Sequence, residues 1–163
     1  MKAIIIGSHH HNTLGLIRSL GRNGVKPDVL FVNNSGKDDY CQKSKYVKRY
    51  ITVKTYDEAL SHLILGTFLD DNCHPVLFPS SDGAEYMLDI NMYMLKNKYV
   101  VPGINNKQGE VAKLMNKAVQ NLWAQSLGIQ TAKTYLVDLQ DVIAGGGNSL
   151  CSKACFESSR QQK

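Results

Sequence analysis

Side chains that could bind a small molecule are concentrated in two short loops and at two lysines. The loops are GSHHHNTLG at residues 7–15 and PSSDG at residues 79–83. Lys117 stands in a helical stretch, where a lysine is most often a solvated surface residue. Lys153 stands in a short possible strand, SLCSKA, where an inward lysine is costly without an anionic partner such as phosphate. Taken alone, neither lysine identifies a phosphate site.

The first loop lies between an apolar strand and a helix, where free backbone N–H groups and the helix dipole favour an anion. Its two glycines, Gly7 and Gly15, do not have the GxGxxG spacing, and no acidic residue ends the second strand, which argues against NAD. The adjacent histidines lack a carboxylate or cysteine partner, so we predict no metal site. We expect solvent-exposed histidines, with a substrate-contacting role for one of them as the alternative.

The second loop allows two interpretations that do not exclude each other. Ser81 or Asp82 can cap the helix that follows, a contribution of about 1 kcal/mol. The same hydroxyls and carboxylate can contact the amine or the carboxylate of a small substrate. The sequence also contains no GxSxG nucleophile motif and no P-loop.

Composition limits the class of protein. The 163 residues are 43% hydrophobic and 20% charged, which predicts a packed core rather than disorder. The net charge of +5 suits phosphate-bearing ligands, but the basic residues are scattered, so we predict no nucleic-acid partner. No apolar run approaches the ~20 residues of a membrane span, no secretory signal is present, and the four cysteines form no CxxC. We therefore expect a cytoplasmic protein with free thiols and no membrane association.

The elements that must position these side chains alternate along the chain. Apolar and β-branched runs predict strands at residues 3–6, 28–33, 50–53 and 75–78, with a short fifth at 99–101. Apolar spacing and capping residues predict helices at residues 12–23, 56–69 and 81–95. This alternation predicts a Rossmann-like, three-layer α/β fold with a parallel sheet. Ligands in such sheets bind beyond the carboxyl ends of the strands, where both loops lie.

Pro102-Gly103 marks a break, so we place a first domain at residues 1–103 and a second segment at 104–163. Helical sequence follows at residues 107–127, with Val111, Met115, Ala118 and Leu122 at the spacing of one helix face. Asn116 can cap a second helix within this range. Gly128 is a helix stop, and residues 131–137 have the composition of a strand.

The order of these segments resembles the beginning of an ATP-grasp carboxylate–amine ligase. The resemblance covers residues 2–137, and its strongest parts are LGLIRSLGRNGV, LFPSSD and KLMNKAVQNLWAQSLGIQTAKTY. It is greatest for the branch with D-aspartate-ligase-like and carbamoyl-phosphate-synthase-like proteins. The resemblance implies a pre-ATP-grasp domain followed by the first elements of an ATP-grasp domain.

The resemblance also implies a reaction. A carboxylate is activated by ATP as an acyl-phosphate, which an amine then attacks, while Mg²⁺ and lysines neutralise the phosphates. By position, Lys117 and Lys153 match the nucleotide-contacting lysines of the family. The places where relatives hold the acceptor substrate, a small carboxylate or amine, correspond to two groups of residues: His11, Asn12, Thr13 and Gly15, and Ser80, Ser81 and Asp82.

Family members are roughly twice as long as this chain, so the resemblance implies that the Mg²⁺-binding acidic residues lie beyond residue 163. We therefore expect a fragment that does not catalyse ligation alone and that binds ATP and Mg²⁺ weakly or not at all. The alternative is a stand-alone module that binds a small molecule without catalysis. A Rossmann-type oxidoreductase is a third hypothesis, supported only by the first strand–helix–strand unit. Apolar surface left exposed by a missing domain would favour a homodimer.

Overall fold

The computed structural model describes residues 1–33, 40–70 and 73–131. The chain divides into two compact units, Met1–Lys113 and Leu114–Lys163. The domain boundary expected near residue 103 stays a prediction.

The first unit is built on a four-stranded, wholly parallel sheet. Its strands are β1 (Ala3–Gly7), β2 (Asp28–Val32), β3 (Arg49–Val53) and β4 (Val76–Pro79), in the order β3-β2-β1-β4. In β1, Ile5 is in register with Val29 on one side and Phe78 on the other. The predicted fifth strand at residues 99–101 is reduced to one parallel bridge between Val76 and Val100. The Rossmann-like α/β class is confirmed.

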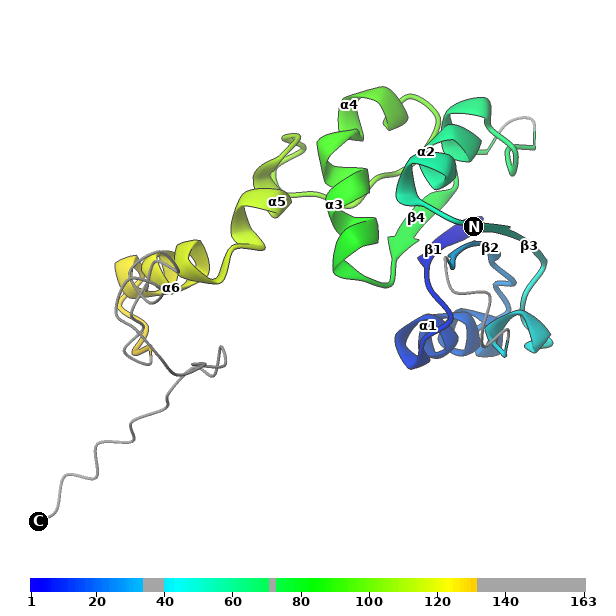
Figure 1. Ribbon diagram of the computed structural model, residues 1–163, viewed down its shortest axis with the longest axis horizontal. Helices are drawn as coiled ribbons and strands as arrows, with labels where there is room; N and C mark the ends of the chain where they lie inside the picture. The colour runs from blue at the N-terminus through cyan, green and yellow to red at the C-terminus, as the bar shows by residue number, and fades with distance from the viewer. Residues whose placement is uncertain (34–39, 71–72, 132–163) are drawn as a thin grey trace, which may run out of the picture. The chain divides into compact units, whose positions relative to one another are not determined.

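Alternate residues of the strands serve two separate cores, one on each face of the sheet (Figure 1). Ile5 faces α1 (His11–Arg22) and the short 3₁₀ helix η1 (Cys41–Lys43), where it packs with Ile17. Ile4 and Ile6 face α2 (Tyr56–Leu65), α3 (Asp82–Ile90) and α4 (Met92–Leu95). Both faces of β1 are buried, which explains why its sequence is an uninterrupted apolar run.

Two predicted helices are longer than the observed ones. The helix expected at residues 56–69 ends at Leu65, because Gly66 adopts a left-handed conformation with φ 74° and closes the helix. The helix expected at residues 81–95 is divided into α3 and α4 at Asn91, whose side-chain amide donates to the Met87 carbonyl at 2.8 Å. Asn91 thus satisfies a carbonyl that is left without a helical partner.

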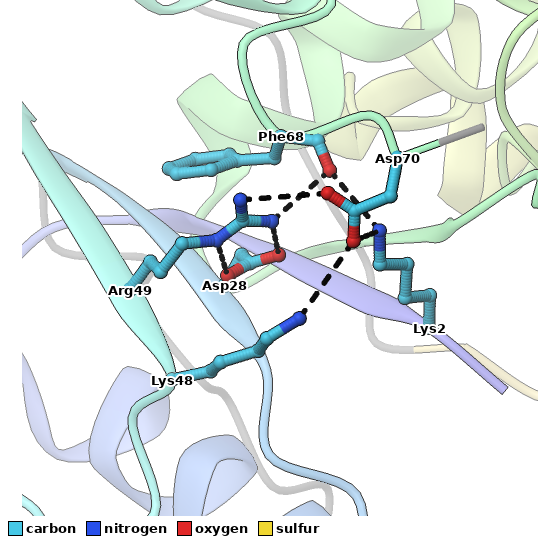
Figure 2. A network of polar contacts seen from close by, with 6 residues as sticks. All are labelled: Lys2, Asp28, Lys48, Arg49, Phe68 and Asp70. Atoms are coloured by element: carbon cyan, nitrogen blue, oxygen red, sulfur yellow. Dashed lines mark hydrogen bonds and ion pairs between the residues drawn. The ribbon is translucent and has the colours of Figure 1, made fainter.

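A polar network ties together the amino ends of the strands (Figure 2). Asp28, which is 1% exposed at the start of β2, accepts two hydrogen bonds from the Arg49 guanidinium at 2.8 and 2.7 Å. Arg49 also donates to the Phe68 carbonyl at 3.2 Å and lies over the Phe68 ring. Lys2 pairs with Asp70, which lies just beyond that phenylalanine. The network fixes the α2–β4 connection at the sheet edge opposite the two loops.

Two helices carry the chain onward from residue 110. They are α5 (Glu110–Leu114) and α6 (Lys117–Ser126), and the Asn116 side chain caps α6 by accepting from the Ala118 N–H at 2.9 Å. The division at Asn116 and the stop at Gly128, with φ 74°, are confirmed. The single apolar face predicted through this region is wrong, because the helix is interrupted and Leu122 is 66% exposed. The strand predicted at residues 131–137 lies outside the described residues after Thr131.

Among the described helices, none is both long and apolar enough to cross a lipid bilayer.

Candidate functional site

The two loops singled out in the sequence meet at the carboxyl ends of β1 and β4. These strands are neighbours in the sheet, but α1 leaves β1 toward one face and α3 leaves β4 toward the other. The connections therefore diverge and leave a crevice between them. In doubly wound sheets this switch point is where ligands bind.

Gly7 allows the two loops to come together. A Cβ atom on Gly7 would lie 1.7 Å from the Ser80 hydroxyl oxygen, so any other residue there would displace the Ser80 side chain. Through this gap the Ser80 backbone N–H donates to the Ile6 carbonyl at 2.9 Å. The glycine at the end of β1 is therefore a requirement of close approach rather than of a dinucleotide.

Thr13 lies beneath the site rather than in its wall. The residue is fully buried, and its hydroxyl donates to the Ser8 carbonyl at 2.6 Å. The same oxygen lies 2.7 Å from the Ser80 hydroxyl, so α1 and the β4 loop are joined by side chains. Thr13 thus positions Ser80.

Ser81 caps α3, as the sequence predicted for either Ser81 or Asp82. Its hydroxyl accepts from the Ala84 N–H at 3.3 Å and lies 2.9 Å from the Tyr56 hydroxyl of α2. Tyr56 reaches this position because Gly83 has no side chain; a Cβ there would lie 2.5 Å from the tyrosine ring. The β4–α3 turn is therefore held from α2 as well as from β1.

A pocket of about 670 Å³ lies between the first turns of α1 and α3. Its α1 side is lined by His11, Asn12, Gly15, Leu16 and Ser19. Its α3 side is lined by Pro79, Ser80, Ser81, Asp82 and Glu85. Six of the seven substrate-contact positions expected from the sequence border this space, and the seventh, Thr13, lies behind Ser80. The volume suits a metabolite-sized ligand.

The charges around the pocket are uneven. Its α3 side holds two carboxyl groups, Asp82 and Glu85, in the first turn of the helix, whereas the first turn of α1 holds none. Burial, followed by the negative charge of Asp89, raises the pKa of Glu85 above its ordinary value. The lining residues include no lysine or arginine. The α3 side therefore favours a cationic or hydrogen-bond-donating group, and the α1 side favours an anionic one.

The three adjacent histidines have three different environments. His10 caps α1, its ring nitrogen accepting from the Asn12 N–H at 3.5 Å, and His11 is exposed at the pocket. The sequence predicted exposed histidines, and His10 and His11 are exposed. His9 is instead half-buried, and its ring stacks on Phe31 with a centroid distance of 4.1 Å. Only His11 is available to a ligand in the pocket.

The two candidate phosphate-binding lysines belong to other parts of the chain. Lys117 is the first residue of α6, in the second unit, and is exposed. Lys153 lies outside the described residues. Among the residues described, no group of three or more histidine, cysteine, aspartate or glutamate side chains is arranged to hold a metal ion. Cys41 and Cys73 carry free thiols.

Three lining residues lie outside the two loops singled out in the sequence: Leu16, Ser19 and Glu85. Ser19 lies four residues beyond Gly15, and Glu85 lies four beyond Ser81. Residues at this spacing share a helix face. Extending each predicted site residue by one helical turn would have found both polar members.

A comparison of the sequence with models of protein families gives no match, and a search of curated proteins finds no match either.

Proposed function

We propose that the first unit binds a small carboxylate or amine substrate in the pocket between α1 and α3, as the substrate-binding part of an ATP-dependent carboxylate–amine ligase. The observation that carries the proposal is the pocket itself. It lies at the switch point of the sheet and is bordered by both loops that the sequence singles out.

The polar groups of the pocket suit a substrate with both a donor and an acceptor. Ser80 and the Glu85 carboxyl group can accept hydrogen bonds from an amine. The first backbone N–H groups of α1 have no partner within the helix, and apart from that of Asn12, which the His10 ring accepts, they can donate to a carboxylate. Such a substrate would lie across the pocket from α3 to α1.

In the ligase proposal ATP supplies the phosphoryl group that activates the carboxylate, with Mg²⁺ neutralising the phosphates. Lys117 is the described residue proposed to contact the nucleotide, and Lys153 is proposed as the second. Their role rests on the sequence resemblance: Lys117 does not line the pocket, and Lys153 lies outside the described residues.

The binding step is tested by titrating the full chain with three ligand series: short carboxylates, primary amines and amino acids. We expect one series to shift the backbone amide resonances of Gly15 and Gly83 in NMR spectra. Ser19→Leu, which fills the α1 side of the pocket, should weaken binding at least tenfold. Ser61→Leu is the matched control, since Ser61 is an exposed serine on α2 away from the pocket. Equal binding by both variants would place the ligand elsewhere.

A second candidate function is a stand-alone binding module without catalysis, which the pocket favours because the described lining residues all belong to one unit. Titration with ATP and Mg²⁺ separates the two functions. The ligase proposal allows the full chain to bind ATP only weakly, and it expects Lys117→Ala to abolish that binding, while Lys107→Ala, an exposed lysine ten residues earlier in the sequence, leaves it unchanged. Substrate binding together with ATP binding that Lys117→Ala removes would support the ligase, and ATP binding that Lys117→Ala leaves unchanged would contradict the role of Lys117.

A further inference from the structure

Glu85 and Asp89 lie one helical turn apart on α3 and contact two different parts of the first unit. Glu85 lines the pocket. Asp89 is fully buried, and its Oδ2 atom accepts a hydrogen bond from the Ala112 N–H at 2.8 Å. Ala112 is the third residue of α5, so Asp89 caps α5 from a neighbouring helix. One helix therefore carries both a pocket residue and the cap of the next segment.

The hydrogen-bonding capacity of the Asp89 carboxylate is only partly used. The second carboxylate oxygen of Asp89, Oδ1, is buried and has no hydrogen-bond partner among the described residues. A buried carboxylate with one backbone donor is sensitive to any nearby charge, because little solvent screens it. The positive end of the α5 dipole favours the charge of Asp89. The charge of Glu85, one turn away on the same helix, opposes it.

The rest of the α5 attachment depends on few contacts. Gln108 accepts a hydrogen bond from the Tyr93 N–H at 3.0 Å, and Gly103 fits closely against the Met92 side chain. Between them, Asn105 and Asn106 adopt left-handed conformations, with φ 53° and 54°, which are uncommon for residues other than glycine. α5 contains no fully buried residue. The hydrogen bond from Ala112 to Asp89 joins α5 directly to α3.

We infer that Glu85 and Asp89 couple the pocket to α5, so that neutralising Glu85 strengthens the bond from Ala112 to Asp89. A ligand cation beside Glu85 would have this effect, because it removes the repulsion that Asp89 experiences. The coupling is reciprocal, so a docked α5 would in turn favour a cation in the pocket. α5 ends at Leu114, which is the first residue of the second unit. Pocket occupancy would therefore be communicated to the chain that enters that unit.

The coupling is tested without any ligand, and so independently of the proposed function. Hydrogen exchange of the Ala112 amide, followed by NMR on the full chain, reports how firmly that N–H is held. We expect Glu85→Gln to raise the protection of Ala112 about twofold, the size of a like-charge pair one turn apart. Asp82→Asn is the matched control, because it removes a carboxylate from the same helix and pocket two turns from Asp89. It should leave the protection of Ala112 unchanged.

A second variant separates the coupling from a general effect on α3. Asp89→Asn should lower the protection of Ala112 about fivefold, because a charge-assisted hydrogen bond becomes a neutral one. Glu85→Gln should have no further effect in that background. The inference is overturned if Glu85→Gln leaves Ala112 unchanged, if Asp82→Asn has the same effect, or if the effect of Glu85→Gln persists without Asp89. If Asp89→Asn does not fold, the comparison of Glu85→Gln with Asp82→Asn still tests the coupling.

Discussion

Thr13 and Ser80 join the two sides of the sheet's carboxyl edge through a hydroxyl pair 2.7 Å apart. Each hydroxyl has one proton to donate. The Thr13 oxygen lies only 2.6 Å from the Ser8 carbonyl, so its proton is placed there and its lone pair accepts from Ser80. Ser80 also lies 3.2 Å from the Ile6 carbonyl, a longer contact. Whether the Ser80 hydroxyl donates to Thr13 or to the Ile6 carbonyl, its proton points away from the pocket. Ser80 therefore offers lone pairs to the pocket, which favours a ligand with N–H groups.

Replacing Thr13 with valine tests this pair at nearly constant volume. The change removes the hydroxyl and leaves a buried Ser8 carbonyl with one donor fewer. We expect the free energy of unfolding to fall by about 1–3 kcal/mol, measured by urea denaturation. Thr52→Val on β3 is the control, since Thr52 is exposed and such surface changes stay within about 0.5 kcal/mol. A Thr13 variant as stable as that control would show that the hydroxyl pair contributes nothing.

Two glycines of α1 should respond in opposite directions to the same substitution. At Gly15 nothing lies within 4 Å of an added Cβ, so alanine gains helix propensity and stabilises by about 0.5–1 kcal/mol. At Gly21 the added Cβ would lie 2.2 Å from the Tyr46 ring. Overpacking of this kind costs about 1–3 kcal/mol. Thermal denaturation of both variants measures the difference.

Each glycine variant is the other's control, because helix, residue type and added methyl group are the same. Gly15→Ala also adds a methyl group to the wall of the pocket, so it should weaken ligand binding while it stabilises the fold. Two variants that shift the melting temperature in the same direction would contradict the packing of α1 against Tyr46.

The ion pair between Arg49 and Asp28 should be the most sensitive part of the polar network in Figure 2. Asp28 is buried, and the loss of its partner would leave an uncompensated carboxylate between β1 and β3. Buried pairs broken in this way cost about 3–5 kcal/mol, and because the Arg49 side chain is 39% exposed we expect about 2–3 kcal/mol for Arg49→Met. Urea denaturation measures this loss in the free energy of unfolding.

Lys48→Met is the matched control for that variant. Lys48 precedes Arg49 in the chain and lies 3.8 Å from Asp70, but it makes no contact with Asp28 and is 45% exposed. We expect less than about 1 kcal/mol for its loss. If the two variants were equally stable, the network would act through its overall charge rather than through the bidentate pair.

The sheet was predictable because its signals are local. The apolar run at β1, the capping-box spacing of Thr55 and Glu58 before α2, and Gly24 after α1 each indicate an element within a few residues. The Thr55 hydroxyl does accept from the Glu58 N–H, at 3.2 Å. The helix boundaries at Leu65 and Asn91 were missed because apolar sequence continues past each of them and buries itself in the same core.

The pocket was predictable in its main parts because the carboxyl ends of parallel strands meet at one edge. The roles of the individual pocket residues could not be predicted from the sequence. Whether Thr13 would line the pocket or support it depends on its distance from Ser80, which no sequence spacing gives. The same holds for Asp89: its use as a cap for α5 requires a contact between residues 23 positions apart.

The pH dependence of stability should carry the signature of Glu85. Burial and the charge of Asp89 raise the pKa of Glu85 above 4.5, its ordinary value. The folded protein therefore holds this proton to higher pH than the unfolded chain does, and the free energy of unfolding falls as pH rises from about 4.5 through the folded-state pKa. Glu85→Gln has no proton to lose. We expect its stability, from urea denaturation, to fall less across that range than the stability of the parent protein.

Asp70 provides the control, because its effect has the opposite sign and a different range. The hydrogen bond from Lys2 lowers the pKa of Asp70 below 3.8, so its contribution is present above that pH and is lost as pH falls through the folded-state pKa. Asp70→Asn should therefore change the acid limb below 3.8 and leave the slope above 4.5 as it is. A Glu85→Gln variant with the parent's slope above 4.5 would mean that Glu85 does not have a raised pKa. Its charge would then be too well solvated to act on Asp89, and the coupling to α5 would lose its physical basis.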